Sequence, residues 1–148
     1  MVGRLGRTAE NALAQAYAER ATAVGRSLGL GPVEVVEVEA RKPGKAAEAE
    51  ALAPHFDGAH LIACDERGQD WSSRDIAERI AALRDQGNRR LALVVGGPDG
   101  LDVSVVRAAR ERLAFGAQTW PHALARVMLA EQVYRATTIL AGQPYHRD

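Results

Sequence analysis

The sequence contains only one cysteine, Cys64, in 148 residues. A single cysteine cannot form a disulfide within the chain and cannot build a cysteine-based metal site. His55 and His60 show no ligand spacing with other histidines or with carboxylates, so we expect no metal ion. The scarcity of cysteine also fits a reducing compartment.

Long hydrophobic runs are absent as well. The apolar run Leu91–Val95 is far too short to cross a bilayer, which takes about 20 residues. Residues 1–7 lack the apolar segment of a secretory signal peptide. We therefore expect a cytoplasmic protein that does not enter the membrane.

The chain has no excess of charge of either sign, because 19 basic residues balance 19 acidic ones. This balance argues against a general polyanion binder but permits a local basic patch. Lysine is rare, with only Lys42 and Lys45, so nearly all basic residues are arginines. A GC-rich genome explains this bias and the many alanines. Bidentate contacts of arginine with phosphate are a second, compatible explanation.

The common nucleotide-binding signatures are missing too. The glycines of residues 96–100 match neither the dinucleotide fingerprint nor the phosphate loop of nucleotide hydrolases. A cluster of metal-binding carboxylates is also not evident. These absences disfavour a nucleotide hydrolase.

Hydrophobic periodicity and turn residues nevertheless predict an ordered series of elements. The predicted helices, with caps at Thr8, Ser72 and Asp102, cover residues 8–26, 46–53, 73–86, 103–112 and 121–141. The predicted strands cover residues 33–38, 59–64, 91–95 and 115–119. Strands that alternate with helices indicate an α/β fold with a mostly parallel sheet flanked by helices, here as a single domain over residues 1–148.

A glycine-rich loop, residues 96–100, lies between a predicted strand and a predicted helix. In parallel sheets ligands bind beyond the carboxyl ends of the strands, and glycines allow a close approach of the backbone. A tight turn without a ligand explains the same residues equally well. The local sequence alone leaves both interpretations open.

The C-terminal residues Tyr145, His146 and Arg147 form a second candidate site. Chain ends are usually frayed, yet an aromatic ring, an imidazole and a guanidinium together suit base stacking and phosphate binding. On the preceding helix His122 and Arg126 are four residues apart and share a face, which Arg135 need not share. Taken alone, a solvated helix face is the simpler explanation of these three residues.

Four blocks of the sequence, taken together, resemble one family. They are residues 93–100, 119–122, 126–136 and 144–147. In order and spacing they are similar to the RlmH family of 23S ribosomal RNA (pseudouridine-N3) methyltransferases, which belongs to the SPOUT class. The resemblance covers nearly the whole chain.

This resemblance implies a fold with a C-terminal trefoil knot and a homodimer whose active sites use both chains. It implies S-adenosylmethionine as the cofactor and a pseudouridine of 23S ribosomal RNA, in assembled ribosomes, as the substrate. The family's cofactor positions correspond here to Cys64, Gly96, Phe115, Gly116, Ala117, Gln118, Thr119 and Trp120.

The implied chemistry assigns roles to the polar residues. N3 of the base is a poor nucleophile until its proton leaves, so the protein must position the base and help to remove that proton. We expect His146 or His122 to aid deprotonation and Tyr145 to stack on or orient the base. Phosphate or the developing imide anion would be held by Arg126, Arg135 and Arg147.

The sequence departs from the family in two places. Members usually have a hydrophobic strand before the segment that corresponds to residues 2–5, and we expect this strand to be missing here. Phe115 and Trp120 also replace smaller aliphatic residues. Two alternatives stay open: a knotted methyltransferase for another RNA, such as tRNA, and a ribosome-binding module without catalysis, which would not bind the cofactor.

Overall fold

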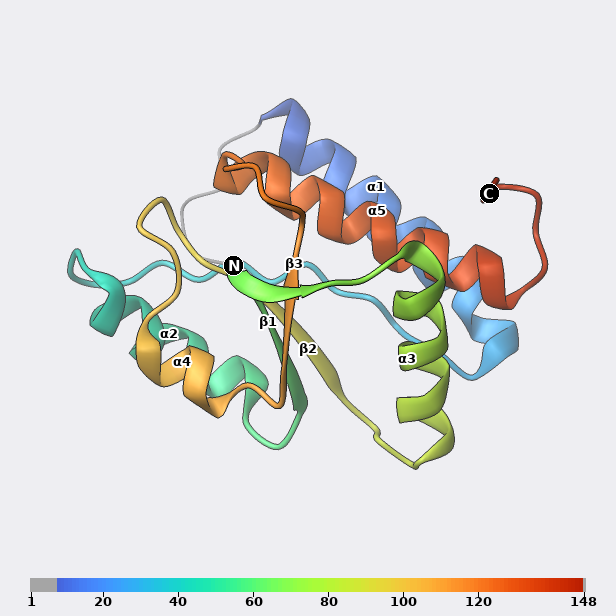
Figure 1. Ribbon diagram of the computed structural model, residues 1–148, viewed down its shortest axis with the longest axis horizontal. Helices are drawn as coiled ribbons and strands as arrows, with labels where there is room; N and C mark the ends of the chain where they lie inside the picture. The colour runs from blue at the N-terminus through green and yellow to red at the C-terminus, as the bar shows by residue number, and fades with distance from the viewer. Residues whose placement is uncertain (1–7, 148) are drawn as a thin grey trace.

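The computed structural model describes residues 8–147, which form a parallel sheet flanked by helices (Figure 1). The sheet has the order β2-β1-β3, and both pairings are parallel. Its strands are β1 (His60–Asp70), β2 (Leu91–Val95) and β3 (Glu111–Ala114). The helices are α1 (Ala9–Gly25), the 3-10 helix η1 (Arg26–Leu28), α2 (Lys45–Phe56), α3 (Ser73–Asp85), α4 (Val103–Ala108) and α5 (His122–Leu140). The predicted α/β class with a parallel sheet is therefore confirmed.

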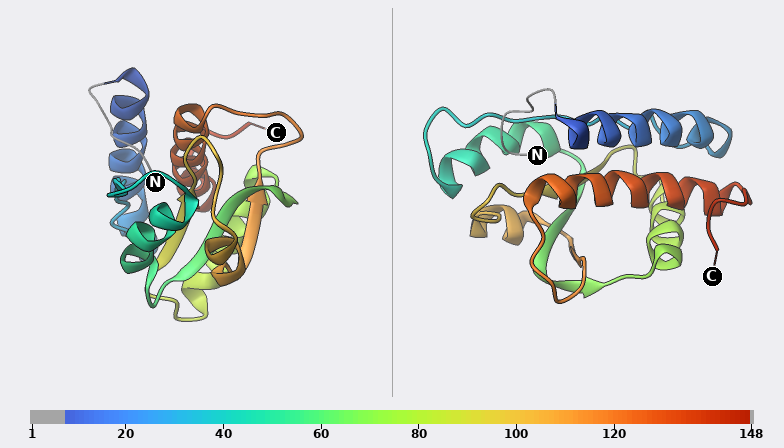
Figure 2. Two further views of the ribbon diagram at one scale, coloured as in Figure 1. Left: turned by 90° about the vertical axis from the view of Figure 1, so that its left-hand side faces the viewer. Right: turned by 90° about the horizontal axis from the view of Figure 1, so that it is seen from above.

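Each face of the sheet carries its own hydrophobic core. On one face Ile62, Val95 and Leu113 pack against apolar residues of α3 and α5. On the other face Leu61 and Val94 pack against α2 and α4. This alternation follows from the two-residue period of a strand, which sends successive side chains to opposite faces. α1 lies outside α5, and the two helices run side by side (Figure 2).

Side-chain caps fix the starts of three helices, as the sequence predicts. The Thr8 hydroxyl accepts a hydrogen bond from the Asn11 amide at the start of α1. At α3 the Ser72 hydroxyl accepts from the Asp75 amide, and the Asp75 carboxylate accepts from the Ser72 amide. Such a reciprocal box satisfies two amides that have no partner within the helix. Asp102 caps α4 through the Ser104 amide.

The predicted strand at residues 33–38 is wrong. Apart from a single bridge at Val38, this segment has no strand pairing in the described part of the chain. Its start is held by α1 instead, because the Thr22 hydroxyl accepts a hydrogen bond from the Val33 amide at 2.8 Å. The apolar side chain of Val38 packs with Leu52 and Val94, so it contributes to the core without forming a ladder.

The predicted strand at residues 115–119 lies too late in the sequence, and the helix predicted for 103–112 ends at Ala108. β3 occupies Glu111–Ala114, because Leu113 pairs with Cys64 and fills the core. Burial of Leu113 and the ladder with β1 outweigh the helical preference of residues 109–112. Residues 115–120 therefore form the loop that leads into α5, whose helical residues begin at His122.

β1 also extends beyond its predicted end at Cys64. It continues to Asp70, with a bulge in which both Cys64 and Gln69 align with Leu113. Gly68 within this bulge lies against β3, since a Cβ on Gly68 would stand 2.6 Å from the carbonyl carbon of Leu113. The polar residues 65–70, which follow the predicted strand of residues 59–64, thus belong to β1 because glycine permits this close approach.

Two earlier expectations concern other parts of the chain. The segment of residues 2–5, before which a strand was expected to be missing, lies outside the described residues. Among residues 8–147 no helix is long and apolar enough to cross a membrane.

A half-buried charge cluster links the sheet to α3 at the amino ends of the strands. Glu111 Oε1 lies 2.5 Å from His60 Nε2, and Glu111 Oε2 lies 2.7 Å from Arg79 Nε. Burial by itself raises the pKa of Glu111, but the hydrogen bonds with Arg79 and His60 outweigh burial and bring the pKa below its ordinary value of 4.5. The ionised form of Glu111 is therefore favoured by folding.

This cluster predicts a loss of stability in acid. Because the folded-state pKa is lowered, Glu111 stabilises the fold above pH 4.5, and this contribution disappears as the pH falls below that value. We expect Glu111→Gln to reduce the free energy of unfolding at neutral pH by about 2 kcal/mol and to flatten its decline between about pH 5 and about pH 3. Urea titrations across this range measure both effects. Glu66→Gln, at an exposed carboxylate, is the control, and equal pH profiles for the two variants would contradict the assignment.

Candidate functional site

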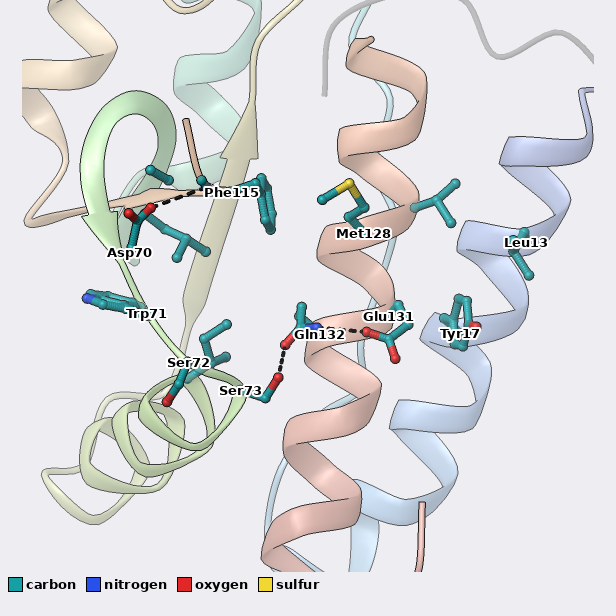
Figure 3. Close-up of a pocket in the computed structure, with 15 residues that line it drawn as sticks. Leu13, Tyr17, Asp70, Trp71, Ser72, Ser73, Phe115, Met128, Glu131 and Gln132 are labelled. Carbon is teal, nitrogen blue, oxygen red and sulfur yellow. Dashed lines mark hydrogen bonds between the residues drawn. The ribbon is translucent and has the colours of Figure 1, made fainter. Parts of the chain in front are cut away.

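A hollow of about 600 Å³ lies between the end of β1, the start of α3 and the helices α1 and α5 (Figure 3). This volume is within the range of small-molecule sites, about 300–1,000 Å³. Its lining comes from segments far apart in the sequence: Leu13, Tyr17, Asp70, Trp71, Ser72, Ser73, Ile76, Leu113, Ala114, Phe115, Gly116, Val127, Met128, Glu131 and Gln132. The hollow is thus created by the fold and not by one motif.

Most of the lining is apolar, but a line of hydrogen bonds crosses it. The Ser73 hydroxyl donates to Gln132 Oε1 at 2.8 Å, and the Gln132 amide donates to Glu131 Oε2 at 2.9 Å. These bonds tie the start of α3 to α5 (Figure 3). Asp70 supplies a second carboxylate at the opposite wall. An apolar slot with a few fixed polar groups is the usual form of a ligand site.

The loop of residues 115–120 borders the hollow. Phe115 and Gly116 line it, while Ala117, Gln118, Thr119 and Trp120 are exposed. The Gly116 amide donates to Asp70 Oδ1 at 3.2 Å, and the Trp120 indole donates to the Phe115 carbonyl at 3.0 Å. Gly116 has φ +83°, which only glycine adopts without strain. The first bond holds the loop against the carboxyl end of β1, and the second joins the two ends of the loop.

Gly96 follows the end of β2 and Cys64 lies within β1, level with that end, but neither residue lines the hollow. Cys64 is aligned with Val95 of β2 and with Leu113 of β3, so it is close in the sheet to both loops. Burial of its thiol raises the pKa of Cys64 to about 12. Gly96 is buried, and a Cβ there would stand 2.6 Å from the carbonyl carbon of Gly100. This contact shows that the glycine is needed for a tight turn.

The C-terminal residues are not frayed but fold onto α5. The Tyr145 hydroxyl donates to Glu131 Oε1 at 3.0 Å, and its ring packs edge-on against Tyr134 at a centroid distance of 4.7 Å. The Arg135 guanidinium lies 4.8 Å from the centre of the Tyr145 ring, and its Nη1 lies 3.3 Å from His146 Nδ1. Tyr145, His146 and Arg135, all predicted site residues, are therefore brought together.

Glu131 is the centre of this arrangement. Its Oε1 accepts hydrogen bonds from Arg135, four residues later, and from Tyr145. Burial, followed by the neighbouring Tyr17 and Glu131, raises the pKa of Tyr145 well above its ordinary value. The phenol therefore stays protonated at neutral pH and acts as a donor. Arg135, Tyr145 and His146 together form the C-terminal group. Since Tyr17 and Glu131, which neighbour Tyr145, also line the hollow, the C-terminal group lies at the margin of the hollow.

The remaining predicted residues lie elsewhere. His122 is half-buried at the start of α5, and Arg126, only 7% exposed, has its Nη1 3.9 Å from Glu37 Oε1. Arg126 and Arg135 are nine positions apart, which is about 13 Å along the helix axis. Arg147 is exposed. Within one chain, His122 and Arg126 are thus apart from the C-terminal group.

Sequence reasoning missed several residues of the site: Tyr17, Asp70, Ser73, Glu131 and Gln132. For Glu131 a signal existed, because an acid four residues before Arg135 on a helix favours an ion pair. For the others the relevant neighbours are distant in the sequence. In residues 8–147 no group of three or more His, Cys, Asp or Glu side chains could hold a metal ion.

Comparisons with known proteins identify the family of this chain. The profile of a family described as "Predicted SPOUT methyltransferase" matches residues 1–146. A protein of Caulobacter vibrioides, named "Ribosomal RNA large subunit methyltransferase H", is 65% identical over 147 residues, which cover 99% of this chain and 95% of the relative. Proteins with the same name from Phenylobacterium zucineum and Dinoroseobacter shibae are 67% and 54% identical, with 99% of this chain and 96% of each relative covered.

The profile match spans nearly the entire chain, and the identity to these relatives is high over the same length. The matched region includes the hollow, the glycine-rich loop and the C-terminal residues up to His146. The chain therefore belongs to the SPOUT family of methyltransferases.

Proposed function

We propose that this enzyme methylates N3 of a pseudouridine in 23S ribosomal RNA, on assembled ribosomes in the cytoplasm, with S-adenosylmethionine as the methyl donor. The proposal rests mainly on Glu131, which lines the hollow and also accepts a hydrogen bond from Tyr145 of the C-terminal group. A cofactor and a target base must be adjacent for methyl transfer, and these two features share a wall. The relatives, named as methyltransferases of the large ribosomal subunit RNA, support the choice of substrate.

The hollow suits the proposed cofactor. S-adenosylmethionine combines a flat adenine ring and a polar ribose with a cationic sulfonium, an ammonium group and a carboxylate. The lining offers apolar side chains, among them Phe115 and Met128, and the carboxylates of Asp70 and Glu131. Opposite charges in a partly buried site attract more strongly than in water. When bound, the cofactor supplies a methyl group that is already reactive.

In our proposal residues of β1 and of the loops after β2 and β3 hold the cofactor. These are Cys64, Gly96 and the loop of residues 115–120, which is anchored by the bond between the Gly116 amide and Asp70. The proposal includes the trefoil knot of the SPOUT class around this position. Phe115 and Gly116 belong both to this set and to the hollow, so they connect the two.

The C-terminal group would receive the base. Tyr145 would stack on or orient the pseudouridine, while Arg135 and Arg147 would hold phosphate or the imide anion. A guanidinium only donates hydrogen bonds, so the Arg135 contact makes His146 Nδ1 an acceptor. The same lone pair would accept the N3 proton, and we expect RNA phosphate to draw Arg135 away from it.

A homodimer completes the proposal. His122 and Arg126 are too far along α5 to reach the C-terminal group of the same chain, but a composite site would let them act in the partner's site. Large apolar side chains exposed on α1, on α5 and before α5 offer a surface for association: Leu13 (44% exposed), Leu124 (43%) and Trp120 (42%). Burial of such side chains is a main driving force of stable dimers.

Cofactor binding is the first test. We expect calorimetric titration to detect binding of S-adenosylmethionine, and Phe115→Ala to weaken it about tenfold or more, because the variant removes an aromatic wall of the hollow. Val103→Ala, at an exposed apolar residue of α4, serves as the control. A folded parent that binds no cofactor would instead indicate a ribosome-binding module without catalysis.

The C-terminal group is tested by the rate of methyl transfer to ribosomes. Loss of a general base costs about a hundredfold or more, so we expect His146→Ala to be slow while it still binds the cofactor. Tyr145→Phe removes only the hydroxyl that donates to Glu131 and should reduce the rate less. His55→Ala, at an exposed histidine of α2, should behave as the parent. A normal rate for His146→Ala removes this residue from the proposal, and methylation of free tRNA in place of ribosomes would change the substrate.

Association is tested by sedimentation equilibrium. We expect a mass twice that of the 15.9 kDa chain for the parent. Leu124→Glu places a charge on the apolar surface and should shift the equilibrium toward the monomer, because an unpaired charge in an interface is costly. A parent that is monomeric at micromolar concentration would overturn the composite site.

A further inference from the structure

The glycine-rich loop has a closed shape that depends on two contacts of its own backbone. The Gly100 amide donates to the Gly97 carbonyl at 3.0 Å, and Gly100 has φ +80°. Gly96 and Gly97 are buried, and Gly96 lies directly against the backbone of residues 100 and 101. Gly97 has an ordinary φ and no such backbone neighbour, so its lack of a side chain needs another explanation.

The neighbour of Gly97 is a carboxylate from α2. A Cβ on Gly97 would stand 3.1 Å from both carboxylate oxygens of Glu48, which is half-buried. One turn earlier, Lys45 Nζ stands 3.9 Å from the corresponding position on Gly100. Lys45 also acts on Asp102, whose pKa is lowered first by hydrogen bonds from Ser104 and then by the charge of Lys45. The first turn of α2 thus lies beside the loop at Gly97 and at Gly100.

The helix that carries these side chains is itself fixed to the sheet. Ala49 and Leu52 of α2 are buried in the same core as Val94 at the end of β2 and Val105 of α4. The strand before the loop and the helix after it are therefore packed on one rigid element. A charged side chain on that element can act on the loop without being part of it.

We propose that Glu48 and Lys45 are positioning residues that hold the glycine-rich loop, residues 96–100, in the shape that binds the cofactor. The inference rests on the proposed function, because Gly96 is one of the proposed cofactor positions. Gly97 is glycine so that the Glu48 carboxylate can lie against the loop backbone. Neither side chain takes part in the transfer step; each acts through the loop.

A double-mutant cycle between Glu48 and Gly97 tests the contact. Gly97→Ala introduces a methyl group that the Glu48 carboxylate must avoid, whereas the backbone conformation itself tolerates alanine. We expect Gly97→Ala and Glu48→Ala each to weaken cofactor affinity about tenfold, as loss of supporting contacts around a site commonly does. In the Glu48→Ala background the effect of Gly97→Ala on affinity should shrink to about twofold or less, because the effects of substitutions at contacting residues are not additive.

Two further variants separate positioning from general damage. Glu48→Gln keeps the shape of the side chain and should recover affinity to within about threefold of the parent. Glu50→Ala, at an exposed carboxylate of the same helix, should leave affinity unchanged. Both should melt at the parent's temperature, and with saturating cofactor Glu48→Ala should keep the parent's kcat.

Amide hydrogen exchange of the protein without ligand supplies a readout independent of the cofactor. We expect the Gly100 amide, bonded to the Gly97 carbonyl, to exchange about tenfold faster in Glu48→Ala and at the parent's rate in Glu50→Ala. Unchanged exchange in Glu48→Ala, or an equal effect of Gly97→Ala in both backgrounds, overturns the inference. If the parent binds no cofactor the proposed function fails, while the exchange rates still decide whether Glu48 holds the loop.

Discussion

The parallel pairing of β1 with both of its neighbours is the constraint on which the rest of the molecule depends. Because β1 lies in the middle, Cys64 is aligned with Val95 on one side and with Leu113 on the other. The loops that follow β2 and β3 are thereby brought to one edge of the sheet, and ligands of parallel sheets usually bind at this edge. The hollow, the glycine-rich loop and the start of α5 all take their positions from this alignment.

The sequence predicted those elements whose signals are local. Caps at Thr8, Ser72 and Asp102 and the apolar run of β2 needed only near neighbours, and they are found where expected. β3 was placed wrongly, since its position is set by Leu113 meeting Cys64, a residue 49 positions earlier. A β-branched segment at 33–38 has strong strand preference but no ladder partner, so preference alone was misleading.

The candidate site was also predictable only in part, because some of its residues have local signals and others are brought together only by the fold. Tyr145, His146 and Arg135 were recognised by their chemistry and by resemblance to a family, and they lie together. The walls of the hollow came from four separate segments, and no pattern within one segment could reveal them. Arg126 has a neighbour that the sequence did not indicate, since in the fold it is buried beside Glu37. Packing decides which groups a side chain contacts, and the spacing of residues along the sequence does not reveal this packing.

The Glu131 carboxylate has a consequence for how this region can change over evolutionary time. Glu131 Oε1 accepts hydrogen bonds from Arg135 and from Tyr145, and Oε2 accepts one from Gln132. Replacement of any one of these residues leaves the others with a polar group to satisfy again, so single changes are disfavoured where paired changes are tolerated. We expect positions 131, 132, 135 and 145 to covary among descendants of this sequence, as one inherited unit shared between a helix and a chain end.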